Sequence, residues 1–247
     1  MKATATDLNS FAKSYARWRG GELGRITDQL QERLLREMIG DVRSRDVLDV
    51  GCGDGVLAVA LARAGGHVTG LDPDPLMLET ATRRATAESV ELYLLRGQAE
   101  SLPFADATFD QVTAVTVLCF VPQAEKAIAE MVRVLKPGGR LVIGELGRWS
   151  AWAAVRRVRG WLGHPIWAIA HFRAVGALRR LLERQGLSIC ETRGSSYYPP
   201  IGWMASLMAG IDPWLGQQTT WGAGFVALSA RKPVGLDESR HRNRDFV

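Results

Sequence analysis

The chain of 247 residues is long enough for one large α/β domain, or for a core domain with a small cap. Its composition, with 47% hydrophobic and 23% charged residues, is that of a globular protein and excludes the disordered and fibrous classes. The formal net charge of +5 is only mildly basic, so charge alone does not indicate a nucleic-acid or membrane partner.

Cysteine usage and the absence of long apolar runs bear on the compartment. Cys52, Cys119 and Cys190 are widely spaced within or beside apolar runs, which is typical of buried, reduced thiols rather than of a disulfide framework. No pair has the CxxC spacing of a zinc site, and we expect no metal. The first residues lack the apolar stretch of a secretion signal, and no run reaches the ~18 apolar residues of a membrane span. We therefore expect a cytoplasmic protein.

Strand and helix signals alternate through the first part of the chain. Residues 8–40 carry helical periodicity that ends at Gly40. Apolar runs then predict five strands separated by helical segments: strands at 47–50, 67–72, 90–95, 109–118 and 140–146, and helices at 56–65, 75–87 and 124–135. This alternation predicts βαβ units and a Rossmann-like, doubly wound, mostly parallel α/β sheet.

The second part of the chain is less regular. A segment rich in Trp and Arg spans 148–171, and helical periodicity returns at 174–185. A sixth strand is predicted at 187–194, an irregular apolar segment at 195–217, and a seventh strand at 222–231. We expect a single domain over 1–247, with parts as follows: an N-terminal helical lid at 8–40, a cofactor-binding core at 45–146, a cap with helix and strand six at 147–217, and a flexible tail at 232–247.

The glycine cluster in VLDVGCGDG (47–55) marks the first candidate site. Gly51, Gly53 and Gly55 follow a predicted strand and precede a helix, where glycines allow a tight turn and close approach of a ligand to the backbone. The spacing GxGxG differs from the dinucleotide fingerprint GxGxxG. Asp49 also places a carboxylate at the turn, which would repel a pyrophosphate and attract an amino group. The pattern therefore favours a ligand with a cationic amino-acid moiety.

Asp72 ends the second predicted strand, about 20 residues after the glycines. Because Pro73 follows it, Asp72 could simply cap a helix. In a doubly wound sheet, however, this position lies across the cleft from the glycine turn, where a carboxylate can accept both ribose hydroxyl protons. Together with Asp49 and the glycines, the second interpretation is favoured.

Four motifs in order then carry a family resemblance: VLDVGCGDG (47–55), LD (71–72), GQAESLPFADATFDQVTAVTVL (97–118) and RVLKPGGRLVIGE (133–145). They resemble the class I S-adenosylmethionine (SAM)-dependent methyltransferases, and most of all the branch with the ubiquinone/menaquinone and sterol methyltransferases. The resemblance is strong over 45–146 and weaker through YARW (15–18) and 172–187.

This resemblance implies S-adenosyl-L-methionine as cofactor. The residues carried over are Asp49, Gly51, Cys52, Gly53 and Thr116 for the methionine portion, Asp72 for the ribose, Pro73, Gln98 and Ala99 for the adenine, and Tyr15 for the N-terminal lid. Two positions depart from the family pattern. Gln98 stands where the family usually has Asp, although an amide oxygen can still accept a hydrogen bond from the adenine amino group. Ala16 stands beside Tyr15 where the family often has Asp.

Methyl transfer from a sulfonium is an in-line displacement, so an enzyme mainly has to align the reactants and exclude water. No catalytic residue is obligatory, because a general base is needed only where the acceptor must lose a proton. The ionisable side chains that could line the acceptor side are His164, His171, Glu145, Tyr197 and Tyr198. His171 and Tyr15 rank first among the catalytic candidates.

The cap sequence favours an apolar small-molecule acceptor. Tryptophans and arginines cluster together at Trp149, Trp152, Trp161 and Trp167 with Arg148, Arg156, Arg157 and Arg159, and the apolar stretch 199–216 follows strand six. We expect a lid with an apolar inner face, lined by Trp152 and Trp203, and with its arginines facing water or anionic lipid headgroups. The expected partners are thus a hydrophobic or aromatic acceptor and, transiently, a membrane surface, with the protein a monomer or homodimer.

Two other functions remain open. A non-catalytic scaffold with this fold would have no need of acidic residues at both ends of a cleft, so Asp49 and Asp72 argue against it. An RNA or DNA methyltransferase would need a basic patch with stacking aromatics, for which the Trp/Arg segment at 148–161 is the one candidate. Nucleic-acid binding that weakens steeply with salt would distinguish it, but a small-molecule acceptor is favoured.

Overall fold

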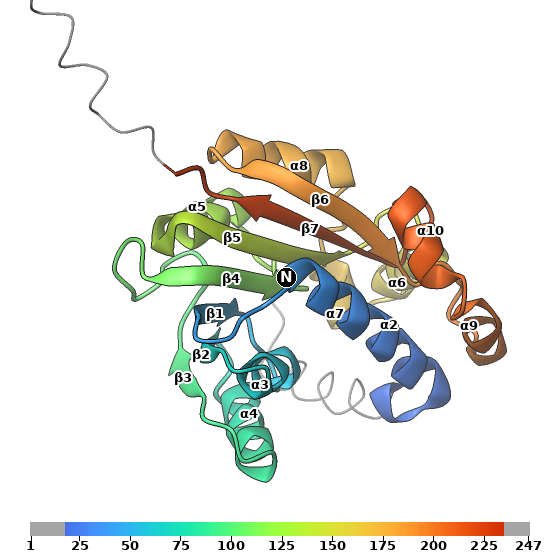
Figure 1. Ribbon diagram of the computed structural model, residues 1–247. Coiled ribbons are helices and arrows are strands. Elements are labelled where there is room, and N and C mark those ends of the chain that lie inside the picture. Colours follow the sequence, from blue (N-terminus) through green and yellow to red (C-terminus); the bar gives the residue numbers. More distant parts are fainter. Residues whose placement is uncertain (1–17, 235–247) are drawn as a thin grey trace, which may run out of the picture.

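Seven strands form one sheet in the computed structural model, which describes residues 18–234 (Figure 1). The strands are β1 (Asp46–Val50), β2 (His67–Asp72), β3 (Tyr93–Arg96), β4 (Phe109–Val115), β5 (Leu135–Leu146), β6 (Ser188–Ser195) and β7 (Phe225–Arg231). Their order is β3-β2-β1-β4-β5-β7-β6. Only β7 runs antiparallel to its neighbours β5 and β6, whereas the other pairs are parallel. The predicted Rossmann-like, mostly parallel sheet is confirmed.

Helices cover both faces of this sheet. They are α2 (Glu22–Ile39), α3 (Val56–Arg63), α4 (Pro75–Ala87), α5 (Ala124–Val134), α6 (Ala151–Trp161), α7 (Pro165–Ile169), α8 (Val175–Arg184), α9 (Gly202–Met208) and α10 (Asp212–Gln218). Figure 1 shows α5 and α8 on one face and α2 and α3 on the other. Two buried apolar clusters lie between these helices and the sheet. Because side chains alternate along β1, Leu48 belongs to one cluster and Val47 to the other.

Helix α2 packs against the sheet. It buries Leu34, Leu35 and Met38 and packs against β5, β6 and β7. The helix begins after Gly21 and ends at Gly40, whose φ of +76° suits glycine. Residues 22–39 thus form an N-terminal helix whose apolar stripe faces the sheet, and the role of 8–40 as a lid stays a prediction. Residues 8–17, with Tyr15, lie outside the described part of the chain, as do residues 235–247 of the expected tail.

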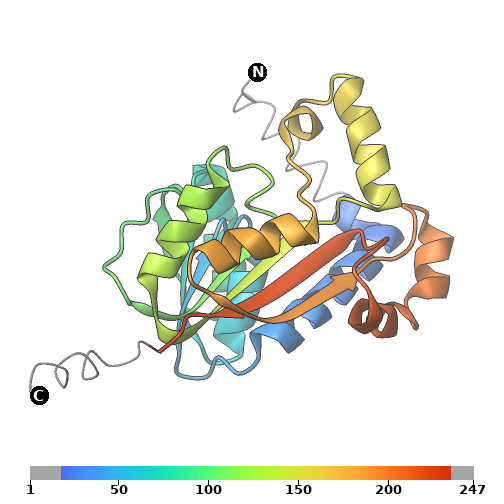
Figure 2. The ribbon, with the colours of Figure 1, turned by 90° about the horizontal axis from the view of Figure 1, so that it is seen from above.

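The strand order indicates which edge of the sheet can bind a ligand. Strand β1 lies between β2 and β4, so the helices that follow β1 and β4 leave the sheet on opposite faces, and ligands bind at such switch points beyond the carboxyl ends of the strands. The connections after β5 and β6 also leave from carboxyl ends. Figure 2 shows that α6 and α7 from one connection and α9 and α10 from the other gather at the same end of the sheet.

Three sequence expectations are corrected by these elements. The segments at 148–171 and 195–217 contain α6, α7, α9 and α10, because exposed apolar residues such as Trp161, Trp203 and Leu207 conceal the helical periodicity. Strand β5 begins at Leu135 instead of 140, because the segment KPGG continues the strand. Cys190 is exposed on β6, whereas Cys52 and Cys119 are buried as expected.

A buried carboxylate organises the chain after β6. Asp212, at the first turn of α10, accepts hydrogen bonds from the backbone N–H groups of Ser196 (3.0 Å) and Tyr197 (2.8 Å). It also accepts one from the Ser195 hydroxyl at 3.1 Å. These bonds hold Ser196 at φ +65°, a left-handed conformation that a serine rarely adopts. Asp212 therefore ties α10 to the end of β6.

We predict that Asp212→Ala lowers the free energy of unfolding by about 2–4 kcal/mol, because two buried N–H groups lose their acceptor. Urea denaturation would measure this loss. Gln217→Ala, at an exposed position of the same helix, should change the free energy of unfolding by less than about 0.5 kcal/mol. Equal stability of Asp212→Ala and the control would show that this turn does not depend on the carboxylate.

Candidate functional site

The glycine turn after β1 combines close packing with an open side. Gly51, Gly53 and Gly55 all have positive φ (+67°, +54° and +79°). A Cβ on Gly51 would lie 2.5 Å from Val117 Cγ2, and one on Gly55 would lie 2.7 Å from the Cβ of Ala81. A Cβ on Gly53 would meet no atom within 4 Å. Packing thus requires glycine at 51 and 55, while Gly53 leaves its backbone open to a ligand.

Asp72 joins the second strand to the glycine turn. Its buried carboxylate accepts the Gly53 N–H through Oδ2 at 2.9 Å and the Asp74 N–H through Oδ1 at 2.9 Å. Burial raises the pKa of Asp72, and the two backbone hydrogen bonds oppose this rise. Since a carboxylate has about four acceptor positions, two more donors can be accommodated. A pair of vicinal hydroxyls is a suitable partner.

Asp49 lies beneath the turn, at the end of β1. It is only 2% exposed and accepts a hydrogen bond from the Thr113 hydroxyl of β4 at 2.7 Å. Burial, with a smaller contribution from the charge of Asp72, raises the pKa of Asp49 to about 7, although the Thr113 hydrogen bond opposes this rise. Thr113, which no sequence motif marks, is thus the side chain that orients Asp49. A carboxyl group of this kind is poised to ionise when a cation approaches.

The residues expected around an adenine lie at the neighbouring strand ends. Gln98 and Ala99 follow β3, and the backbone is tied to β2 there by a hydrogen bond from the Gly97 N–H to the Asp72 carbonyl at 3.2 Å. The side chain of Gln98 is exposed, that of Ala99 is buried, and Pro73 is exposed at the start of the β2–α4 connection. The structure therefore brings these three positions to the edge that carries Asp72.

The buried Cys52 has a thiol pKa raised by burial, so it is no nucleophile.

The loop after β4 completes this edge. Thr116 adopts φ +57°, which is rare for a β-branched residue, and its N–H donates to the Gly144 carbonyl at 2.6 Å. Glu145 accepts the Leu118 N–H at 2.8 Å, and burial raises the pKa of Glu145 to about 7. Because Glu145 is 2% exposed and engaged in this bond, its position indicates support of the loop rather than contact with an acceptor.

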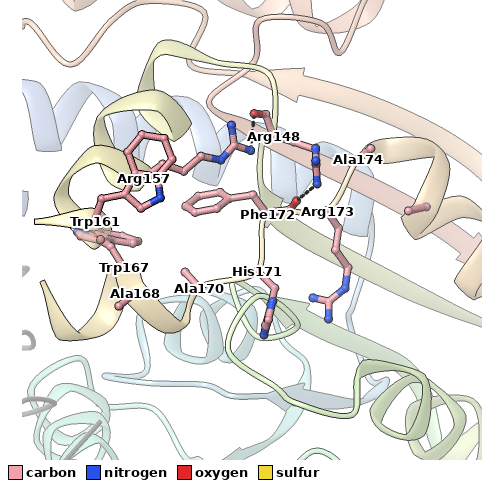
Figure 3. Close-up of a pocket in the computed structure, with 12 residues that line it drawn as sticks. Arg148, Arg157, Trp161, Trp167, Ala168, Ala170, His171, Phe172, Arg173 and Ala174 are labelled. Atoms are coloured by element: carbon pink, nitrogen blue, oxygen red, sulfur yellow. Dashed lines mark hydrogen bonds between the residues drawn. The ribbon is translucent and has the colours of Figure 1, made fainter. Parts of the chain in front are cut away.

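A pocket of about 560 Å³ opens beside the loop (Figure 3). Its walls come from α6, α7 and the segment leading into α8, and its main side chains are Arg148, Arg157, Trp161, Trp167, His171, Phe172 and Arg173. The backbone N–H of His171 donates to the Cys119 carbonyl at 2.8 Å, and the Arg173 guanidinium donates to the Leu118 carbonyl. These bonds fasten the pocket to the loop after β4.

The two tryptophans expected to line the acceptor side, Trp152 and Trp203, lie outside this pocket. Trp152 is buried and packs edge-on against Trp18 and Tyr198, with ring centroids 6.0 and 6.3 Å apart. Trp203 is 67% exposed on α9, so neither tryptophan lines the pocket. Arg148 and Arg157 line the pocket, where backbone carbonyls and an aromatic ring hold them, and Arg148 stays exposed to water as expected. Of the expected ionisable candidates, His171 is the one that lines this pocket.

The remaining candidates have other surroundings. Tyr198 is buried, with its hydroxyl 3.0 Å from the Thr27 hydroxyl. Tyr197 donates its hydroxyl to the Thr219 carbonyl, and His164 precedes α7 with its ring 6.0 Å from that of Trp167.

Between residues 18 and 234, no group of three His, Cys, Asp or Glu side chains is arranged to hold a metal ion. No helix in that range is long and apolar enough to cross a bilayer.

Comparison with known proteins agrees with this geometry. Residues 48–143 match the family model described as "Methyltransferase domain". Methyltransferase GfsG of Streptomyces halstedii is 32% identical over 240 residues, which cover 85% of this chain and 80% of that protein. The demethylmenaquinone methyltransferase of Renibacterium salmoninarum is 42% identical over 113 residues, about half of each chain (46%).

The fold is shared with solved structures as well. A SAM-dependent methyltransferase from Thermotoga maritima superposes with a TM-score of 0.70 at 22% identity, covering 93% of this chain and 100% of that one. At this level of identity the likeness concerns the fold alone. The sequence relatives, the matched domain and the fold agree with the resemblance seen in the four motifs. The chain therefore belongs to the class I SAM-dependent methyltransferases.

Proposed function

We propose that this SAM-dependent methyltransferase acts on a small aromatic or hydrophobic acceptor. The observation that carries the proposal is the meeting of two features at one edge of the sheet: the open glycine turn with Asp49 and Asp72, and the aromatic-lined pocket beside the loop after β4. The demethylmenaquinone methyltransferase among the relatives supports an aromatic acceptor. Residues 45–146 then form the SAM-binding part and 147–217 the acceptor-side cap.

The residues at the turn fit SAM. The open side of Gly53 gives room for the methionine portion, and the ionisable Asp49 beneath the turn favours its cationic amino group. Asp72 has acceptor positions left for the ribose hydroxyls. The adenine then lies near Pro73, Gln98 and Ala99. The bound cofactor supplies an electrophilic methyl group on a sulfonium.

The chain itself contributes orientation and exclusion of water. The pocket, at about 560 Å³, is within the usual range for a small-molecule site. His171 lines it and is the candidate base for an acceptor that must lose a proton. Tyr15, the other candidate, lies outside the described residues.

We predict micromolar binding of SAM and of S-adenosylhomocysteine, with Asp72→Ala weakening both by about 2–4 kcal/mol through the loss of two hydrogen bonds to a charged acceptor. Isothermal titration calorimetry measures this directly. Asp106→Ala, an exposed position away from the turn, serves as the control. If folded wild-type protein bound neither compound, the proposed function would be refuted.

A second prediction concerns pH. Asp49 in the free protein has a pKa of about 7, well above its usual 3.8, so it is mostly protonated at pH 5.5 and about half ionised at pH 7. If the SAM amino group favours the ionised form, SAM affinity should rise about tenfold between pH 5.5 and 7, and binding should release a proton. Titrations in buffers of different ionisation enthalpy would detect this proton.

Asp49→Asn should flatten this pH dependence. Glu145→Gln is the matched control, because the Glu145 carboxyl also has a pKa of about 7 but supports the loop after β4. Equal pH dependence in wild type and Asp49→Asn would show that Asp49 does not respond to the cofactor.

We further propose that α6 touches an anionic membrane surface transiently. Val155, Val158 and Leu162 form an exposed apolar stripe at helical spacing, and Trp161 beside them is 82% exposed. The surrounding sequence, 147–182, contains seven arginines and no acidic residue. Exposed Trp and Leu within an arginine-rich segment are typical of helices that lie in the interface of anionic bilayers.

This contact predicts co-sedimentation with phosphatidylglycerol vesicles and little with phosphatidylcholine vesicles. The double variant Val158→Asp/Leu162→Asp should lose most of this binding, by about fivefold or more. Leu76→Asp, an exposed apolar position on α4, should retain it. Unchanged sedimentation of the α6 variant would exclude this surface.

A further inference from the structure

The pocket beside the loop after β4 has an unusual electrostatic composition. Three arginines, Arg148, Arg157 and Arg173, line it together with His171, and residues 147–182 contain no Asp or Glu. Its other large side chains are aromatic. A cavity with this lining combines positive charge with flat apolar surfaces, whereas a pocket for a purely apolar molecule has few charged groups.

Backbone and aromatic partners, not carboxylates, hold these arginines in place. Arg148 Nη1 donates to the Phe172 carbonyl at 3.0 Å, and Arg157 Nη2 donates to the Arg148 carbonyl at 3.1 Å (Figure 3). The Arg157 guanidinium lies 5.2 Å from the centroid of the Phe172 ring. Within residues 18–234, neither Arg148 nor Arg157 forms a salt bridge. Their geometry is therefore fixed while their charge remains uncompensated.

Arg173 differs from the other two. It donates to the Leu118 carbonyl, and its charge lowers the pKa of the buried Glu145, against the larger rise caused by burial. Figure 3 shows the side chains of His171 and Arg173 directed toward the loop after β4. Arg173 thus links the pocket to the loop, and Arg148 and Arg157 supply the free positive charge on the opposite wall.

We propose that this pocket binds an aromatic molecule that carries an acidic group, a carboxylate or a phosphate, with Arg148 and Arg157 on the acidic group and Trp161, Trp167 and Phe172 around the ring. Guanidinium groups match the planar geometry of carboxylates and phosphates and stack on aromatic rings. A charged group in a partly enclosed pocket needs such partners to offset its desolvation.

The position of the pocket makes this molecule the methyl acceptor, an assignment that rests on the proposed function. Val117 lies directly against Gly51 of the turn, since a Cβ at 51 would be 2.5 Å from its Cγ2. The next residue, Leu118, bonds to Arg173 of the pocket. One loop therefore separates the glycine turn from the pocket, and the acidic group is anchored on the far wall with the ring toward the loop.

The test is calorimetric titration of the protein saturated with S-adenosylhomocysteine. The probes are 2-naphthoate and 1-naphthyl phosphate, each compared with its neutral counterpart, 2-naphthamide and 1-naphthol. We expect at least one anion to bind about tenfold or more tightly than its counterpart, and to weaken as salt is raised from about 0.05 to 0.5 M. Equal affinity for anions and neutral counterparts, or binding of none of the four, overturns the proposal.

Variants separate the pocket from general surface charge. Arg157→Gln should weaken anion binding about tenfold while leaving the affinity for the neutral counterpart within about twofold. Arg159→Gln is the matched control, because it removes the same charge from an exposed position of the same helix that does not line the pocket. Equal effects of the two variants overturn the proposal, since they would indicate a diffuse basic surface.

The same variants distinguish other anionic partners. If Arg157→Gln and Arg159→Gln impaired binding to phosphatidylglycerol vesicles or to polyuridylate equally, and neither probe discriminated charge, the arginines would serve a membrane or RNA and the proposal would fail. S-adenosylhomocysteine binding is read in the same experiments. Its loss in wild-type protein refutes the proposed function, whereas its retention without anion preference refutes only the acidic aromatic ligand.

Discussion

The contact between the glycine turn and the ends of β2 and β4 is the constraint on which the rest of the site depends. Gly51 lets the turn pass against Val117, and the Gly53 N–H is held by Asp72 at 2.9 Å. Any side chain at 51 would push the turn away from the loop after β4, because its Cβ would lie only 2.5 Å from Val117 Cγ2. One backbone segment thus fixes the distance between the carboxylate at β2 and the loop beside the aromatic-lined pocket.

Buried carboxyl groups beneath these loops add an electrostatic constraint. Asp49 and Glu145 both lie at strand ends, and burial raises the pKa of each to about 7. Such groups reduce stability as they ionise on raising the pH, since the folded protein binds their protons more tightly than the unfolded chain does. A cation bound at the turn would stabilise the ionised form of Asp49 and so offset this loss of stability. Glu145 instead holds the backbone of Leu118.

The sequence predicted the parts of the molecule in which local pattern and tertiary role coincide. Continuous apolar runs such as VLDV mark buried parallel strands, and GCGDG marks a turn that few conformations can satisfy. It failed where the two diverge. Helix α9 exposes Trp203 and Leu207, and α10 exposes Trp214, so no polar face marks them. Thr113, the partner of Asp49, could not be found because cross-strand register depends on the sheet order.

The arginines of the cap are a further case in which the sequence pattern does not reveal the tertiary role of a side chain. Arg148 is exposed and Arg157 half-buried, yet the carbonyls of Phe172 and Arg148 and the Phe172 ring hold both guanidinium groups at the wall of the pocket. Because these partners leave the positive charge uncompensated, the cap would select an acceptor by charge under the function proposed above. In that proposal the cofactor is held by different residues, at the ends of β1 and β2. Substitutions on α6 would then change the acceptor while the geometry of the glycine turn stays fixed.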